Sequence, residues 1–212
     1  MDEVGRLKVA MFTDSFHPAK DGALAAMEIQ ARGLEARGHE VVVVAPDTSP
    51  KPSYPRRVHY LPSVGFRWYP GYRVAVSSSD MMEFIREVRP DVLHCHGIAS
   101  MAILSLTVAR ATKIPHVLTF HTMANEAIKY YSPIPLRDDL MVPLVWVYLR
   151  NMMRRAEVVI APSKPIKDEL EQNGVVMQAC EVVPTGIDTA IYSPANYDKG
   201  FLGRYGLEGK RV

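Results

Sequence analysis

Short, almost continuous apolar runs alternate with amphipathic segments along this chain. The first two runs, Leu7–Phe12 and Glu40–Ala45, predict strands that are buried on both faces, as in parallel sheets. The segment between them carries an apolar stripe at helical spacing, formed by Leu24, Met27, Ala31 and Leu34. We expect Gly38 to end this helix in the left-handed conformation. Together these segments predict a βαβ unit with parallel strands.

The same alternation continues along the rest of the chain. Further strands are predicted at Val58–Val64, Asp91–Cys95, Ile114–Phe120, Val158–Ala161 and Glu181–Val183. Predicted helices include one that Asp80 and Glu83 begin as a capping box and a long one over Asp138–Arg155. The fold class is therefore α/β, a single domain with a doubly wound, mostly parallel, Rossmann-like sheet. Ligands bind such sheets beyond the carboxyl ends of the strands.

The loop after the first predicted strand runs from Thr13 to a helix that begins near Gly22. Backbone N–H groups and the positive end of the helix dipole can hold a phosphate group at such a place. An ordinary strand-to-helix loop with one turn glycine explains the same residues. The chain contains neither G-x-G-x-x-G nor G-x-x-x-x-G-K-[ST], which argues against a nicotinamide-dependent oxidoreductase and a P-loop protein.

Three histidines lie at or after the ends of two neighbouring strands. Strand alternation places His94 and His96 on one face, with Cys95 opposite. His121 follows the later strand. A zinc site is one interpretation, but no nearby carboxylate completes a ligand set, so we predict no metal. We expect His94 to be a hydrogen-bonded core residue, and His96 and His121 to contact a polar substrate.

The last two predicted strands end in turns. Ser163 stands where a helix N-cap is expected, and that role alone would explain it. Gly186 lies in the turn Val183–Asp188, where a glycine lets a ligand or a second domain approach the backbone closely. Each motif is weak by itself, but every strand end that should face a cleft carries a polar or glycine-containing loop.

In this order and spacing, the strand-end motifs resemble a known family. They are Asp14–Gly22, His94–Gly97, Phe120–Thr122, Ala161–Ser163 and Val183–Asp188. The set spans essentially the whole chain and resembles the N-terminal domain of retaining glycosyltransferases of the GT-B fold, a group that includes phosphatidylinositol mannosyltransferases and sucrose synthases. The segments most similar to diacylglycerol glucosyltransferases and related glycolipid synthases are Phe120–Met123, Tyr130–Tyr131 and Pro162–Lys164.

The resemblance implies two Rossmann-like domains, the first mainly for the acceptor and the second for most of the nucleotide-sugar donor, a co-substrate that takes the place of a cofactor. It makes His121 the catalytic histidine, close to the transferred sugar. It places the donor phosphates near Asp21, Gly22 and Ala23. The implied acceptor contacts are His17, His96, Gly97, Thr122 and Tyr130. The side that faces the second domain would carry Ser163, Gly186 and Asp188.

The chain departs from the family pattern in two ways. Ala23 stands where the family often has a second glycine, and Thr185 where it usually has asparagine, which affects the phosphate contact and the turn. The family's Glu-x7-Glu motif and its Arg/Lys pair for the donor diphosphate belong to a C-terminal domain that we expect to be missing here. Residues 1–190 match the N-terminal domain and 191–212 the start of the interdomain linker. We expect little or no activity without the partner domain.

Composition narrows the class of protein further. With 48% hydrophobic and 23% charged residues, the chain has the composition of a globular protein. Its 25 basic and 23 acidic residues leave a net charge of +2, which argues against a nucleic-acid partner. The two cysteines, Cys95 and Cys180, are too few for a disulfide framework and favour a reducing cytoplasmic location. The apolar stretch Leu140–Leu149 is shorter than the roughly 20 residues that span a bilayer.

Two segments bear on contact with a membrane. The predicted helix at Asp138–Arg155 combines apolar residues with arginines, which predicts peripheral contact with the inner face of a membrane. The alternative is a core helix whose arginines lie in solvent near its C-terminus. The aromatic loop Phe66–Tyr72 could insert at a membrane interface or stack on a sugar.

Two functions remain open from the sequence. The first is the acceptor-binding half of a retaining glycosyltransferase, which transfers a sugar to a lipid, a sugar or another hydroxyl acceptor once its donor-binding domain is present. The second is a non-catalytic module that binds a glycan or a lipid head group. A binding module should hold its ligand unaided, whereas half an enzyme should not catalyse transfer alone.

Overall fold

A parallel sheet forms the centre of the protein in a computed structural model that describes residues 5–19, 21–66, 72–121, 138–196, 198 and 200–210. Its strands are β1 (Lys8–Phe12), β2 (Glu40–Pro46), β3 (Val58–Leu61), β6 (Val92–Cys95), β7 (His116–Thr119), β8 (Val158–Ala161) and β9 (Cys180–Val182). The spatial order is β3-β2-β1-β6-β7-β8-β9, and every neighbouring pair is parallel. The predicted α/β, Rossmann-like sheet is confirmed.

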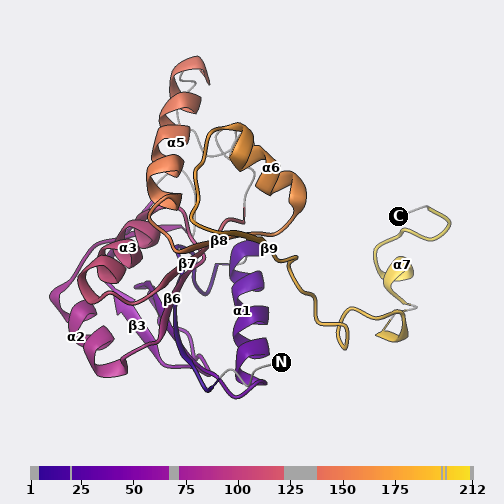
Figure 1. Cartoon of the computed structure of the whole chain (residues 1–212). Coiled ribbons are helices and arrows are strands. Elements are labelled where there is room, and N and C mark those ends of the chain that lie inside the picture. The colour runs from indigo at the N-terminus through magenta and orange to yellow at the C-terminus, as the bar shows by residue number, and fades with distance from the viewer. Residues whose placement is uncertain are drawn as a thin grey trace.

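Helices cover both faces of this sheet (Figure 1). They are α1 (Gly22–Glu35), α2 (Ser79–Val88), α3 (Ser100–Thr112), α5 (Asp138–Met153) and α6 (Lys164–Gln172). Side chains alternate along β1, so Val9 and Met11 pack with α1 in one buried cluster, while Ala10 and Phe12 belong to the cluster that α2, α3, α5 and α6 share. The chain then continues into a 3₁₀ turn (Pro194–Asn196) and α7 (Phe201–Arg204).

Pro62 divides the predicted strand Val58–Val64 into two pieces. β3 ends at Leu61, because proline has no N–H to donate to the ladder. After Pro62, β4 (Ser63–Gly65) pairs antiparallel with β5 (Arg73–Ala75), a small second sheet that the apolar pattern did not predict. The other predicted strands differ from the observed ones by at most two residues at either end.

The helix ends correct several predictions. The capping box of Asp80 and Glu83 is wrong, because α2 begins at Ser79 and the Ser78 hydroxyl donates to the Asp80 carboxylate. Gly38 has the expected left-handed backbone, with φ of 87°, but it lies two residues beyond the C-cap of α1. α5 ends at Met153, two residues earlier than expected, and contains Pro143.

Candidate functional site

The order of the strands defines a crevice between β1 and β6. The chain proceeds outward from β1 in one direction through β2 and β3, and in the other direction from β6 onward. Ligands of doubly wound sheets bind where the strand order reverses, beyond the carboxyl ends of the strands. Asp14 follows β1 at this place, His96 and Gly97 follow β6, and His121 follows the adjacent β7.

His96 and His121 form the centre of the candidate site. Nδ1 of His96 and Nε2 of His121 lie 3.1 Å apart, within hydrogen-bond distance, and the two rings stack with centroids 5.3 Å apart. The His94 ring also contacts His96, with centroids 4.1 Å apart, since alternation along the strand places both on one face. His96 is buried and His121 is partly exposed. The structure thus brings together two residues that lie 25 positions apart in the sequence.

Burial keeps these three imidazoles uncharged at neutral pH. It lowers the pKa of His94 to about 3 and that of His121 to about 4, and it holds the pKa of His96 well below its ordinary value. Neighbouring imidazoles add to the effect on His94 and His96, because a proton on one ring repels a proton on the next. The rings can therefore donate and accept hydrogen bonds but supply no positive charge.

His94 has a structural partner, as we expected of a core histidine. Its Nε2 lies 2.7 Å from the Thr119 hydroxyl in the neighbouring strand. His96 differs, because its Nε2 is buried and has no hydrogen-bond partner among the described residues. Within the described ranges, no group of three or more histidine, cysteine or acidic side chains is arranged to hold a metal ion.

The N-terminus of α1 approaches the same site, since the Asp21 carboxylate raises the pKa of His121, although less than burial lowers it. Asp21 is the N-cap of α1 and accepts a hydrogen bond of 2.8 Å from the Leu24 N–H. Its negative charge opposes a phosphate at this helix end. The predicted phosphate contact of Asp21, Gly22 and Ala23 stays a prediction, and its donors would be the backbone N–H groups rather than the carboxylate.

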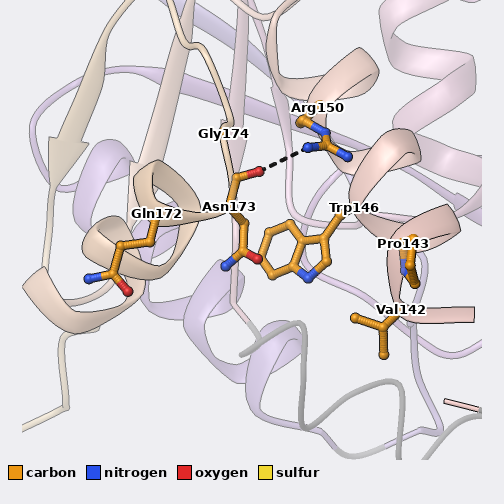
Figure 2. A pocket seen from close by; sticks show the side chains of 7 residues that line it. All are labelled: Val142, Pro143, Trp146, Arg150, Gln172, Asn173 and Gly174. Carbon is orange, nitrogen blue, oxygen red and sulfur yellow. Dashed lines mark hydrogen bonds between the residues drawn. The ribbon is translucent and has the colours of Figure 1, made fainter. Parts of the chain in front are cut away.

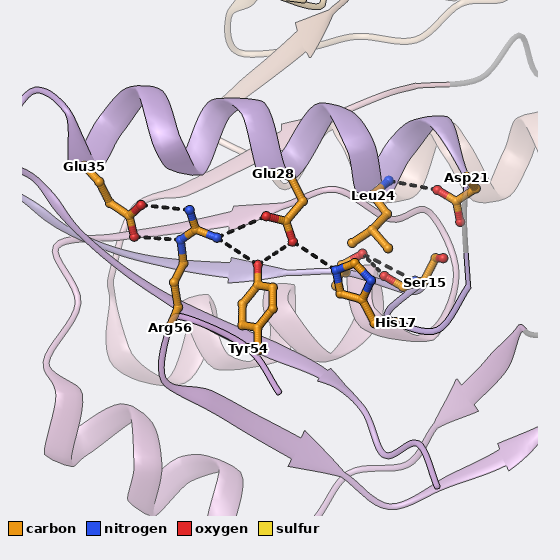
Figure 3. A network of polar contacts seen from close by, with 9 residues as sticks. Ser15, His17, Asp21, Leu24, Glu28, Glu35, Tyr54 and Arg56 are labelled. Atoms are coloured by element: carbon orange, nitrogen blue, oxygen red, sulfur yellow. Dashed lines mark hydrogen bonds and ion pairs between the residues drawn. The ribbon is translucent and has the colours of Figure 1, made fainter. Parts of the chain in front are cut away.

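His17 belongs to a polar network between α1 and the segment before β3 (Figure 3). Its Nε2 lies 3.3 Å from Glu28, and the Tyr54 hydroxyl donates to the same carboxylate at 2.6 Å. Arg56 joins Glu28 at 3.1 Å and Glu35 at 2.6 Å. The structure therefore places His17 against α1, and its predicted contact with an acceptor stays a prediction.

Asp14 is a site residue whose individual role could not be predicted from the sequence. Its carboxylate is buried and accepts hydrogen bonds from the Ala99 N–H and the Met101 N–H, each at 2.8 Å. Gly97 makes room for it, because a Cβ atom at this position would lie 2.6 Å from the Asp14 Cγ. Its position just after a buried strand is the one sequence feature that points to Asp14 as a site residue. The sequence does not reveal its hydrogen-bond partners, because they lie about 85 residues away.

The predicted site residues near the last two strands, Ser163, Gly186 and Asp188, have contacts that do not include His96 or His121. Ser163 is the N-cap residue of α6, as predicted, with an extended backbone, but its side chain makes no capping hydrogen bond. Gly186 faces Ile29 of α1, where a Cβ atom would lie 3.3 Å from the isoleucine. Asp188 accepts a hydrogen bond from the Ala190 N–H at 3.0 Å. Thr122 and Tyr130 lie outside the described residues.

An open cavity of about 510 Å³ lies between α5 and the end of α6 (Figure 2). Its lining comprises Val142, Pro143, Trp146, Arg150, Gln172, Asn173 and Gly174. Arg150 donates to the Asn173 carbonyl at 3.3 Å across it. Of the predicted site residues that lie within the described ranges, none lines this cavity. No helix in the described ranges is long and apolar enough to cross a membrane.

Comparison with family models identifies the family of this chain. The profile described as Glycosyltransferase Family 4 matches residues 22–191. An alpha-monoglucosyldiacylglycerol synthase of Streptococcus pneumoniae is 27% identical over 87% of this chain and 41% of its own length. A GDP-mannose-dependent alpha-mannosyltransferase of Mycolicibacterium smegmatis is 30% identical over 97% of this chain and 55% of its own length. The chain spans about half the length of the curated relatives it matches.

Solved structures share the fold. A crystal structure of Anabaena HepE in complex with UDP-glucose matches with a TM-score of 0.62 and 14% identity, over 98% of this chain and 54% of that protein. Sucrose-phosphate synthase from Thermosynechococcus elongatus matches with the same TM-score and 16% identity, over 95% of this chain and 53% of that protein. At this level of identity the likeness concerns the fold alone.

Proposed function

The chain belongs to glycosyltransferase family 4, and on this basis we propose that it forms the acceptor-binding part of a retaining transferase. The proposed reaction moves a sugar from a nucleotide-sugar donor to a hydroxyl group of a lipid or another acceptor. The observation that carries the proposal is the stacked, uncharged pair of His96 and His121 in the crevice where the strand order reverses.

Neutral imidazoles suit a sugar and its acceptor better than they suit a phosphate. A sugar hydroxyl both donates and accepts hydrogen bonds, and so does a neutral imidazole, whereas an ionised phosphate only accepts and is bound most strongly by charged donors. We assign His121 to the contact with the transferred sugar, because it is the more exposed of the pair. His96 and the Gly97 turn would border the acceptor. The names of two relatives, a glycolipid synthase and a GDP-mannose-dependent enzyme, support these substrate classes.

The departing nucleoside diphosphate needs a different part of the enzyme. Negative charge develops on it as the glycosidic bond breaks, and preorganised cations or N–H groups must stabilise that charge. The imidazoles of the site are uncharged, and the α1 N-terminus already holds the Asp21 carboxylate. We propose that the cations lie on a second domain that binds the donor, and that residues 1–190 transfer little or no sugar without it.

Replacing His121 tests the proposal directly. In the full-length protein that the gene encodes, His121→Ala should lower the rate of sugar transfer by about 100-fold, because loss of one preorganised hydrogen-bonding group from an active site costs about that much. The measurement is transfer of a labelled sugar from nucleotide-sugar donors to lipid acceptors. The anomeric configuration of the product, read by NMR, should equal that of the donor.

His39→Ala is the matched control, because His39 lies at the opposite end of the sheet, where it accepts a hydrogen bond from the Leu7 N–H. It should leave transfer unchanged. Unchanged turnover in His121→Ala would remove His121 from the site. If the full-length protein transfers no sugar from any nucleotide-sugar, yet the 212-residue chain binds a glycan or lipid head group tightly, the protein functions as a non-catalytic binding module.

Peripheral membrane contact through α5 is part of the same proposal. Leu144 and Val147 are about half exposed on this helix, and Arg154 and Arg155 follow it as exposed residues. Apolar side chains beside arginines favour the surface of an anionic bilayer. In this position on the membrane surface, the protein would have access to a lipid acceptor.

A further inference from the structure

Asp14 caps a helix that begins far away in the sequence. Its Oδ2 accepts from the Ala99 N–H, and its Oδ1 accepts from the Met101 N–H and, at 3.2 Å, from the Ser100 hydroxyl. These are the first N–H groups of α3, which need an acceptor because they have no partner inside the helix. The N-cap position itself holds Ala99, whose side chain has no acceptor to offer. The cap of α3 therefore comes from the loop after β1.

The turn between β6 and α3 is closed around this carboxylate. Any side chain larger than hydrogen at Gly97 would collide with Asp14. The Tyr72 hydroxyl, next to β5, hydrogen-bonds to Asp14 as well. From α5, the Tyr148 hydroxyl donates to the Ile98 carbonyl at 2.6 Å. Contacts from the β1 loop, from the residue before β5 and from α5 therefore all stabilise this turn.

A buried carboxylate is a costly way to cap a helix. Asp14 is only 5% exposed, and desolvation of a charge must be offset by hydrogen bonds and by the helix dipole. A serine or asparagine at position 99 would cap α3 locally at a lower cost. A local cap would not tie the β1 loop to the β6 turn across the crevice, and that connection is what Asp14 adds.

We infer that Asp14 is the positioning residue of the crevice, which holds the turn at His96 and Gly97 against β1 so that the His96 ring meets His121. The backbone supports this, since the His96 N–H donates to the Phe12 carbonyl at 2.8 Å, two residues before Asp14. Asp14 also fills the N-terminus of α3, so that helix end is closed to a donor phosphate. The effect of Asp14 on transfer rests on the proposed function, whereas its effect on the histidine pair does not.

NMR of the 212-residue chain labelled with ¹⁵N in its histidines tests the inference. The ring signals of His96 and His121 are assigned with His96→Gln and His121→Gln. Asp14→Asn replaces one acceptor oxygen by an NH₂ group that faces a backbone N–H. It should shift the ring signals of both histidines and move the pKa of His121 upward from about 4, because a loosened turn admits water.

Asp91→Asn is the matched control. Asp91 accepts a hydrogen bond of 2.7 Å from the Lys8 N–H, and so joins the same two strands, β1 and β6, at their opposite ends. It should leave the signals of His96 and His121 unchanged. Equal changes in both variants would show a general loosening of the strand pair and would overturn the inference.

A folded Asp14→Asn variant with unchanged His96 and His121 signals and titration would likewise overturn it. If that variant does not fold by circular dichroism, Gly97→Ala decides by the same signals, since it keeps the carboxylate but displaces it. If both unfold while Asp91→Asn folds, the carboxylate supports the whole fold rather than the pair, and the inference is wrong. Shifted signals together with a fully active His121→Ala enzyme would reject the proposed function and leave the positioning role standing.

Discussion

Buried histidines give the crevice its chemical character at the scale of single residues. Only one hydrogen can lie between Nδ1 of His96 and Nε2 of His121, so the tautomers of the two rings depend on each other. Protonation of either ring is unfavourable, because the positive charge would be poorly hydrated. A fourth histidine, His116 at the start of β7, also has a lowered pKa. Burial lowers it to about 4, and the Ser105 hydroxyl lies 2.9 Å from its Nε2.

These four histidines make stability depend on pH. Their pKa values are lowered in the folded chain, whereas an unfolded chain titrates them near 6.5. The unfolded chain therefore binds more protons as the pH falls, so the stabilisation is complete above about pH 6.5 and is lost progressively toward pH 4. We expect the free energy of unfolding to fall by on the order of a few kcal/mol between about pH 7 and pH 5.

Urea unfolding at several pH values within this range measures the effect, because carboxylates with ordinary pKa values stay mostly ionised there. Asp14 has the opposite effect on the pH dependence of stability. Burial raises its pKa, so protonation of Asp14 at lower pH favours the folded state. A free energy of unfolding that does not change over this range would contradict the assignment of neutral, buried rings.

At the scale of elements, α1 is fastened to the segment before β3 by a polar network rather than by apolar contacts alone. The Arg56 side chain is 6% exposed and bridges Glu28 and Glu35, which lie two turns apart on the helix. Tyr54 and His17 complete the network at Glu28. α1 carries the Asp21 end toward the histidine site, so its attachment bears on the shape of the crevice.

Removing Arg56 should therefore loosen α1. We expect Arg56→Ala to lower the free energy of unfolding by about 2 kcal/mol, because it leaves the partly buried Glu28 without its cation. Arg57→Ala is the control one residue away: Arg57 pairs with Glu87 on the surface, where ion pairs contribute little. Equal losses in the two variants, measured by urea unfolding, would show that the Arg56 network has no special role.

At the scale of the whole molecule, α5 stands out from the sheet at its first turns (Figure 1). Its buried side chains, among them Trp146 and Leu149, anchor it to the core, while Leu144 and Val147 stay exposed by 56% and 48%. Tyr148 on the same helix reaches the turn after β6. α5 thus connects an exposed apolar surface with the candidate site.

This arrangement predicts an effect of charge on membrane binding. The double substitution Leu144→Glu and Val147→Glu should weaken binding to vesicles that contain anionic lipid by about tenfold or more, because two apolar side chains no longer enter the interface. Cosedimentation with the vesicles measures it. The double substitution Ile103→Glu and Val176→Glu is the control, because both are exposed apolar residues outside α5 and the aromatic loop. Equal binding of the double variant and the unchanged chain would exclude α5 as the contact.

The sequence by itself determined the strands of the main sheet and the class of the fold, but not the small sheet of β4 and β5. Apolar runs such as Val158–Ala161 predict buried strands, because a strand in a parallel sheet is covered on both faces. Alternation along β6 also placed His94 and His96 on one face. These properties are local, since they depend on residues within a few positions of one another, and a periodic pattern records them directly.

Only the tertiary structure decided which strand ends meet. The contact of His96 with His121 and the cap that Asp14 provides for α3 join residues 25 and about 85 positions apart. They depend on the order of strands in the sheet, and no local periodicity encodes that order. Burial in the fold also decided the pKa of the histidines, because removing water from an imidazole disfavours its protonated form.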